Sequence, residues 1–127
     1  MKNEFKAIAQ IIQNNKRVLD VGCGDGTLMQ YLKKNQNNDV RGLEYKKNFV
    51  QICISKGLPV IEGDAERELI QFPDKSFDYI VLSQTLQAFR FPEKVLEQLL
   101  RIGKKTIILY FRDNRSVANN LTKADEL

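Results

Sequence analysis

Apolar and polar residues alternate along this chain in a way that predicts strands and helices in turn. Short runs rich in β-branched residues are typical of buried strands, and the stretches between them carry apolar residues at helical spacing. Strands are expected at residues 17–21, 40–44, 59–62, 77–83 and 106–111. Helices are expected at residues 4–14, 26–34, 46–56 and 92–102, with a short amphipathic segment at 66–71.

Five strands interleaved with helices predict one α/β domain built on a parallel, doubly wound sheet. The stretch 77–83 is apolar almost throughout, which fits a central strand covered on both faces. With 127 residues, of which 43% are hydrophobic, the chain can bury one core but has little margin. We therefore expect no second domain.

A glycine-rich loop follows the first predicted strand. Residues 18–26 read Val-Leu-Asp-Val-Gly-Cys-Gly-Asp-Gly, so a strand passes through a flexible turn into a helix, as in nucleotide-cofactor loops. A dinucleotide fingerprint needs Gly or Ala where Thr27 stands. Asp20 and Asp25 flank the loop and would repel a pyrophosphate, whereas they suit a ligand with an ammonium and a sulfonium group. The loop therefore predicts S-adenosylmethionine.

Two further acids stand at the ends of the next two predicted strands. Glu44 lies about 20 residues beyond the loop, where a carboxylate accepts hydrogen bonds from ribose hydroxyls. Asp64 follows Gly63 and can accept a hydrogen bond from an adenine amino group. Asp64 also fits a helix N-cap, and Asp20 taken alone fits a turn residue. Ligands bind at the strand ends of open parallel sheets, so the three acids together favour a cofactor site.

The remaining composition narrows the function classes. The chain has no histidine, which excludes histidine triads, histidine metal ligands and the usual general base near neutral pH. Cys23 and Cys53 are too few for a disulfide framework or a zinc site, so we expect reduced thiols and no metal. Cys23, between glycines, also fits a reactive thiol. We find no membrane span or signal peptide in the sequence, so a cytoplasmic protein is expected.

The net charge of +4 does not point to nucleic acid. The basic residues are scattered in pairs, and residues 62–78 carry six acids against two bases. The pairs fit solvated helix and turn positions better than one phosphate-tracking face. Nucleic-acid binding is therefore disfavoured.

Two segments carry a resemblance to a known family. They are the loop with its strand, Arg17 to Gly26, and Phe72 to Ala88, which reads Phe-Pro-Asp-Lys-Ser-Phe-Asp-Tyr-Ile-Val-Leu-Ser-Gln-Thr-Leu-Gln-Ala. Residues 15–111 resemble the Rossmann-like class I S-adenosylmethionine-dependent methyltransferases. The Ser-Gln-Thr-Leu-Gln run after the fourth strand is similar, more narrowly, to the methionine biosynthesis protein MetW family. The resemblance implies a five-stranded sheet of order 3-2-1-4-5, with helices on both faces, and a protein that works with a homoserine O-acyltransferase.

The resemblance also implies roles for individual positions. The cofactor would contact Asp20, Gly22, Cys23, Gly24, Gly26, Glu44, Asp64, Ala65 and Ser83. Among these, Asp20, Gly22 and Gly24 would hold the methionine end of the cofactor. Glu44 would hold the ribose, and Asp64 with Ala65 the adenine. Gln84 and Gln87 would face a substrate from the loop after the fourth strand, although a polar loop with a helix start fits them as well.

The sequence leaves the reaction open. No residue is an evident general base, so any methyl transfer would depend on positioning and desolvation. Alternatives to an accessory protein are a methyltransferase that acts on a small molecule and a cofactor-free interaction module. The acidic loop argues against the cofactor-free interaction module.

The chain departs from the family pattern after Leu109. Residues 110–115 replace the usual continuation, and residues 112–127 form a polar tail outside a domain of residues 1–111, without the usual C-terminal hairpin. A shortened protein, a truncated or frameshifted reading frame, and a form completed by a partner all fit. Each leaves the strand at 106–111 as an open edge, so we expect marginal stability or self-association through this strand.

Overall fold

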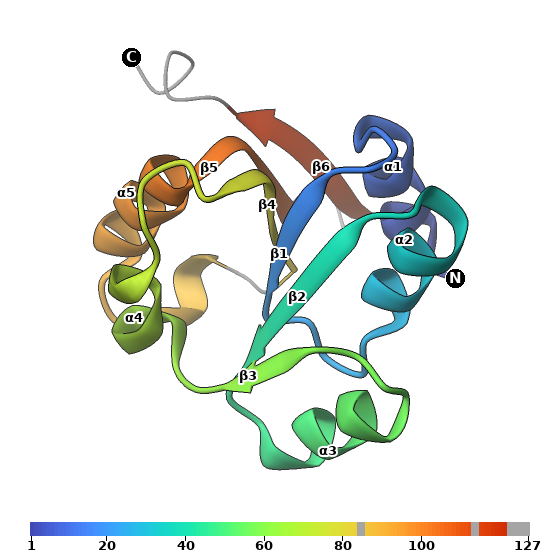
Figure 1. Cartoon of the computed structure of the whole chain (residues 1–127). Coiled ribbons are helices and arrows are strands. Elements are labelled where there is room, and N and C mark those ends of the chain that lie inside the picture. Colours follow the sequence, from blue (N-terminus) through green and yellow to red (C-terminus); the bar gives the residue numbers. More distant parts are fainter. Residues whose placement is uncertain (84–85, 113–114, 122–127) are drawn as a thin grey trace.

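The computed structural model of this protein describes residues 1–83, 86–112 and 115–121. Its centre is one six-stranded sheet with the order β3-β2-β1-β4-β5-β6 (Figure 1). The strands are β1 (Arg17–Val21), β2 (Asp39–Glu44), β3 (Val60–Glu62), β4 (Phe77–Leu82), β5 (Gly103–Arg112) and β6 (Arg115–Leu121). The first five strands are parallel. The predicted order 3-2-1-4-5 is therefore confirmed.

Helices cover both faces of this sheet, as predicted. They are α1 (Asn3–Ile11), α2 (Thr27–Gln36), α3 (Lys47–Ser55), α4 (Ala65–Glu68) with its continuation η1 (Leu69–Gln71), η2 (Leu86–Ala88) and α5 (Pro92–Ile102). Consecutive side chains of β1 point to opposite faces, so Val18 packs with α1, α2 and α3, whereas Leu19 packs with α4, η1 and α5. The sheet therefore divides the core into two layers.

Most element boundaries lie within two residues of the predicted ones, and the two larger differences have local reasons. The first helix ends at Ile11 rather than at residue 14, because Ile12 turns to an extended conformation while its side chain stays buried in the core. The fifth strand begins at Gly103 rather than at residue 106, directly after α5. A Cβ atom at Gly103 would collide with the side chain of Ile80, so only glycine fits this close approach to β4.

The prediction of an open edge at the fifth strand is wrong. Residues 115–121, expected in a polar tail, form β6, which pairs antiparallel with β5 from Arg112↔Arg115 to Thr106↔Leu121. Only two residues, Asp113 and Asn114, separate the strands in the sequence, and both types favour tight turns. Polar side chains do not prevent backbone pairing, so the chain itself satisfies the outer edge of β5. Figure 1 shows β6 passing beside α1.

None of the described helices combines the length and the apolar character needed to cross a bilayer.

Candidate functional site

The candidate site lies at the carboxyl ends of β1, β2 and β4. Asp20 belongs to β1, Glu44 is the last residue of β2, and Ser83 directly follows β4. The chain runs from β1 outward to β2 and β3, and then returns to β4 on the other side of β1. This reversal makes the end of β1 the switch point of the sheet, where open α/β folds bind ligands. Two carboxylates are buried there, since Asp20 is 1% exposed and Glu44 is 5% exposed.

Asp20 is a buried carboxylate in which one oxygen accepts a hydrogen bond and the other has no partner among the described residues. The hydroxyl of Ser83 donates a 2.6 Å hydrogen bond to Oδ1, and Oδ2 has no partner among the described residues. Burial raises the pKa of Asp20 to about 7; the Ser83 hydrogen bond opposes this shift, and the charge of Glu44 adds to it. A cationic group placed at Oδ2 would restore the ionised form. Asp20 is thus suited to an ammonium ligand.

Glu44 holds the glycine-rich loop against the end of β2. Its Oε1 accepts a 2.9 Å hydrogen bond from the backbone N–H of Gly24, and its Oε2 accepts one of 2.9 Å from the N–H of Lys46. A carboxylate oxygen has two lone pairs, so both oxygens keep an acceptor position for a pair of hydroxyls. Glu44 therefore positions the loop and can also bind a ribose.

Two glycines of the loop serve different purposes. Gly24 has a φ of +58°, and a Cβ atom there would meet nothing within 4 Å, so its backbone faces open space. Gly26 has a φ of +82°, and a Cβ atom there would lie 2.5 Å from Cδ1 of Leu58 and 3.0 Å from Sγ of Cys53. Gly24 can let a ligand approach the backbone closely, whereas Gly26 lets the loop pack against the core.

Cys23 turns its side chain into the core rather than toward a ligand. It is 6% exposed and belongs to the same core layer as Met29, and a Cβ atom at Gly42 would lie 2.7 Å from both sulfur atoms. Desolvation by burial, as the main cause, raises the pKa of this thiol, which keeps it protonated. Cys23 and Cys53 are both free thiols, as expected. Any contact between Cys23 and a cofactor would come from its backbone.

Asp25 serves the start of α2. Its Oδ1 accepts hydrogen bonds from the N–H of Thr27 at 3.0 Å and from its hydroxyl at 2.6 Å. The pKa of Asp25 is lowered, first of all by the hydroxyl hydrogen bond. The carboxylate is thus used within the loop, which differs from the expectation that Asp25 and Asp20 act alike toward a cation.

A small pocket of about 190 Å³ lies at the end of β3. Its lining is Leu43, Tyr45, Gly63, Asp64, Ala65, Glu66, Ala88 and Phe89, so it includes the two residues for which an adenine contact is predicted, Asp64 and Ala65. Asp64 is also the N-cap of α4, because its Oδ1 accepts a 3.0 Å hydrogen bond from the N–H of Glu66. The capping bond leaves Oδ2 available, so the structure supports the cap and is compatible with the adenine contact.

Sequence reasoning missed Tyr45 and Phe89. Tyr45 directly follows Glu44 and is 58% exposed at the pocket, whereas Phe89 is buried. Their rings suit a flat heterocycle. An aromatic residue immediately after a strand-end acid was the available signal for Tyr45. Phe89 offered none, because it lies in an irregular stretch between β4 and α5.

Two predicted substrate-facing residues remain predictions. Gln84 lies outside the described residues, and Gln87 lies within η2. Over the described parts of the chain, no three side chains of His, Cys, Asp or Glu come together as a metal site would require.

Comparison with known proteins places this arrangement in a family. The family model described as "Methionine biosynthesis protein MetW" matches residues 2–114. A bifunctional methionine biosynthesis protein MetXA/MetW of Rhodopirellula baltica is 30% identical over 113 residues, which are 83% of this chain and 18% of that protein. A demethylmenaquinone methyltransferase of a Geobacillus strain is 30% identical over 73% of this chain and 43% of its own length.

Solved structures agree with the fold. The crystal structure of a TehB-like SAM-dependent methyltransferase from Corynebacterium glutamicum superposes with a TM-score of 0.72 at 24% identity, over 87% of this chain and 63% of that one. The described fold is thus the Rossmann-like fold of such methyltransferases. The chain spans less than half of each curated relative named above. By the match over residues 2–114, the chain belongs to the methionine biosynthesis protein MetW family.

Proposed function

We propose that the site at the ends of β1, β2 and β4, together with the pocket at the end of β3, binds S-adenosylmethionine. The observation that carries this proposal is the buried Oδ2 of Asp20, which has no partner among the described residues and stands beside a glycine loop. Asp20, Glu44 and Asp64 belong to the ends of three neighbouring strands. Neighbouring strands lie about 4.8 Å apart, so the three acids suit a ligand laid across the strand ends.

Each part of the site would meet a part of the cofactor of matching chemistry. The ammonium would be held by Asp20, the ribose hydroxyls by Glu44, and the adenine by the pocket of Tyr45, Asp64 and Phe89. Gly24 would allow the ligand to touch the backbone. Bound S-adenosylmethionine supplies an activated methyl group on its sulfonium. The demethylated product has the same ammonium, ribose and adenine, so it suits binding measurements.

Calorimetry with S-adenosylhomocysteine tests the cofactor site. We expect micromolar binding, no binding of NAD, and a loss of at least tenfold in affinity for Glu44→Gln, because an amide cannot replace the second acceptor. Glu62→Gln is the matched control, since Glu62 pairs with Glu44 in the sheet register but is exposed at the surface. Equal affinities of the two variants would contradict the assignment of Glu44.

We further propose that this protein works with a homoserine O-acyltransferase in methionine synthesis, as a cytoplasmic accessory protein. Support comes from the relative whose name joins MetXA and MetW in one chain. Acyltransferase activity should rise in a saturable way when this chain is titrated into a fixed amount of the purified enzyme. Activity that is unchanged at saturating concentrations of a folded, cofactor-loaded chain would contradict this role.

Methyl transfer to a small molecule is the second candidate. It is supported by methyltransferases among the relatives, such as the demethylmenaquinone methyltransferase. Formation of S-adenosylhomocysteine in the presence of a candidate metabolite would distinguish this activity from an accessory role. A cofactor-free interaction module is the third candidate, favoured by the fact that both oxygens of Glu44 already accept backbone hydrogen bonds. Absence of S-adenosylhomocysteine binding to the folded chain is the result expected for this candidate.

A further inference from the structure

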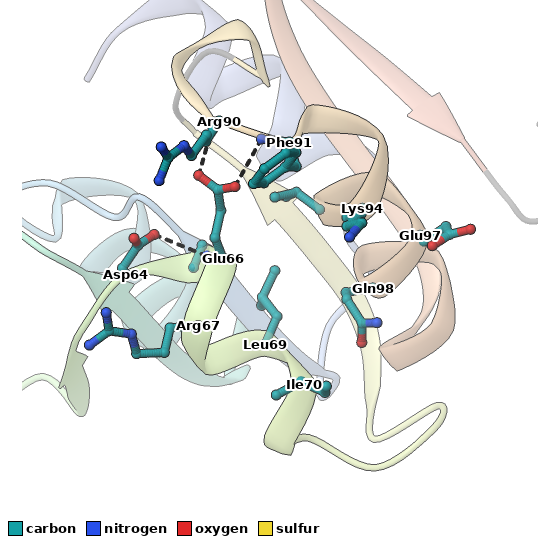
Figure 2. A pocket seen from close by; sticks show the side chains of 12 residues that line it. Asp64, Glu66, Arg67, Leu69, Ile70, Arg90, Phe91, Lys94, Glu97 and Gln98 are labelled. Carbon is teal, nitrogen blue, oxygen red and sulfur yellow. Dashed lines mark hydrogen bonds between the residues drawn. The ribbon is translucent and has the colours of Figure 1, made fainter.

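A second and larger hollow adjoins the proposed adenine pocket, with which it shares Asp64, Ala65 and Glu66. It is a groove of about 550 Å³ between α4 with η1 on one side and α5 on the other (Figure 2). Its lining includes Leu69, Ile70, Phe91 and Val95. Ile70 is 72% exposed and Phe91 is 53% exposed. Large apolar side chains that share one groove and remain exposed mark a binding surface better than isolated ones do.

One carboxylate fixes the shape of this groove. Glu66, on α4, accepts a 2.7 Å hydrogen bond from the N–H of Arg90 and a 2.9 Å hydrogen bond from the N–H of Phe91. Figure 2 shows both bonds joining α4 to the residues that lead into α5. The two walls are thus tied together, so a partner would meet a surface that is already formed and would lose less entropy on ordering it.

The groove presents cations around an aromatic ring. Nζ of Lys94 lies 5.3 Å from the ring centre of Phe91, and the guanidinium carbon of Arg90 lies 6.0 Å from it. Arg67 also lines the groove, but Figure 2 shows its side chain extending from α4 away from α5. Among the described residues, none of these three cations belongs to an ion pair. Lys94 and Arg90, which lie beside the exposed ring of Phe91, are therefore available to a ligand in the groove.

The acids of the groove are less available. The lining carries three carboxylates, so its formal charge is balanced. Glu66 is occupied by two backbone N–H groups, and Asp64 caps α4 through the N–H of Glu66. Figure 2 shows Glu97 pointing away from the groove. The surface is thus complementary to an apolar side chain with a carboxylate beside it.

We infer that this groove is a docking surface for a partner protein, which inserts an apolar side chain flanked by an acidic residue between η1 and α5. The inference rests on the proposed function, which makes the homoserine O-acyltransferase this partner. A nucleic acid fits less well, because a phosphate backbone offers no apolar group to Ile70 and Phe91. Exposed aromatic and cationic residues at one place are typical of interface hot spots.

Binding of the purified acyltransferase to variants of the full chain tests this inference. Ile70→Ser and Lys94→Glu should each weaken binding at least tenfold. The matched controls are Ile54→Ser and Lys33→Glu, which change exposed residues of the same types on α3 and α2, on the other face of the sheet. The controls should stay within twofold of the unmodified chain. Binding of S-adenosylhomocysteine to every variant should be unchanged, as a readout of folding.

The outcomes separate this inference from the proposed function. If the unmodified chain does not bind the acyltransferase, the proposed partnership and the docking surface both fail. If it binds, and the groove variants bind as tightly as their controls, only the docking surface fails. Displacement of the acyltransferase by a short RNA, with loss of RNA binding in Lys94→Glu but not in Ile70→Ser, would make the groove a nucleic-acid surface and overturn the inference.

Discussion

The hydroxyl of Ser83, at the end of β4, donates a 2.6 Å hydrogen bond to Asp20, at the end of β1. This bond stabilises the ionised carboxylate only in part, because burial still raises the pKa of Asp20 to about 7. The residue that would bind the cofactor's ammonium is thus half protonated near neutral pH in the free protein. A functional acid kept in an unfavourable environment is a common feature of ligand sites.

Asp20→Asn should stabilise the free protein at alkaline pH. The native state binds the Asp20 proton more tightly than the unfolded state does, so stability is lost as the pH rises from about 4 through 7. Relative to the unmodified chain, the variant should gain roughly 2–3 kcal/mol of unfolding free energy between pH 5 and pH 8. Urea unfolding at both pH values measures this gap, and a gap that does not widen would contradict the raised pKa.

Cofactor binding should strengthen as the pH rises toward 8. An ammonium beside Asp20 requires the carboxylate to be ionised, so each unit below a pKa of about 7 should cost up to about tenfold in affinity for S-adenosylhomocysteine. Calorimetry at pH 6, 7 and 8 gives this dependence. Asp20→Asn should bind weakly with little change over that range, and a pH dependence retained in this variant would assign the titration to another group.

Alanine at the two loop glycines should separate ligand binding from folding. Gly26→Ala should lose more than about 2 kcal/mol of unfolding free energy, because it combines a φ of +82° with a contact 2.5 Å from Leu58. Gly24→Ala should lose only about 1 kcal/mol, because its Cβ projects into open space, but it should bind S-adenosylhomocysteine at least tenfold more weakly. Thermal unfolding and calorimetry on the same preparations measure the two effects. A larger loss of stability in Gly24→Ala than in Gly26→Ala would contradict this orientation of the loop.

The two cysteines should resist modification in the folded protein. Cys23 and Cys53 are buried, and desolvation raises the pKa of both thiols. A disulfide reagent such as dithiobisnitrobenzoate should therefore react with them slowly at pH 8 and rapidly after addition of guanidinium chloride. Fast reaction of one thiol before unfolding would support the reactive role that the sequence left open for Cys23.

Removal of β6 should expose a sheet edge. A chain ending at Arg112 would leave the outer N–H and C=O groups of β5 without the partners that residues 115–121 provide. We expect self-association and a lower melting temperature. A chain ending at Leu121 is the control, and it should behave as the full chain does. Equal melting temperatures and a monomeric shorter chain in size-exclusion chromatography would show that β6 adds no stability.

The parallel part of the fold could be predicted because its signals are local. Strands β1, β4 and β5 each contain a short apolar run, and Gly57, with a φ of +72°, follows α3 where a helix stop was expected. The pairing of β6 could not be predicted, because residues 115–121 have no apolar pattern and depend on the free edge of β5. A strand of this kind is determined by its neighbour rather than by its own composition.

The candidate site was predictable to the same extent. Acids at the ends of β1, β2 and β3 follow from the strand positions, so Asp20, Glu44 and Asp64 could be named in advance. The hydrogen bonds that these acids accept within the protein could not be predicted. The capping bond of Asp64 and the bond from Gly24 to Glu44 depend on the tertiary structure. Nothing in the sequence separates the inward-facing Cys23 from a ligand-facing residue, because the direction of a loop side chain is set by tertiary packing.

The stretch from Ser83 to Phe91 is fastened at its two ends by two different acids. Asp20 accepts from Ser83 at one end, and Glu66 accepts from the backbone N–H of Phe91 at the other. The hydrogen bond from Ser83 depends on Asp20, a carboxyl group that takes up or releases a proton near neutral pH and would contact the cofactor directly. The residue that follows β4 and the residue that precedes α5 are thus each held by an acid from another element, and the first of these acids stands at the proposed cofactor site.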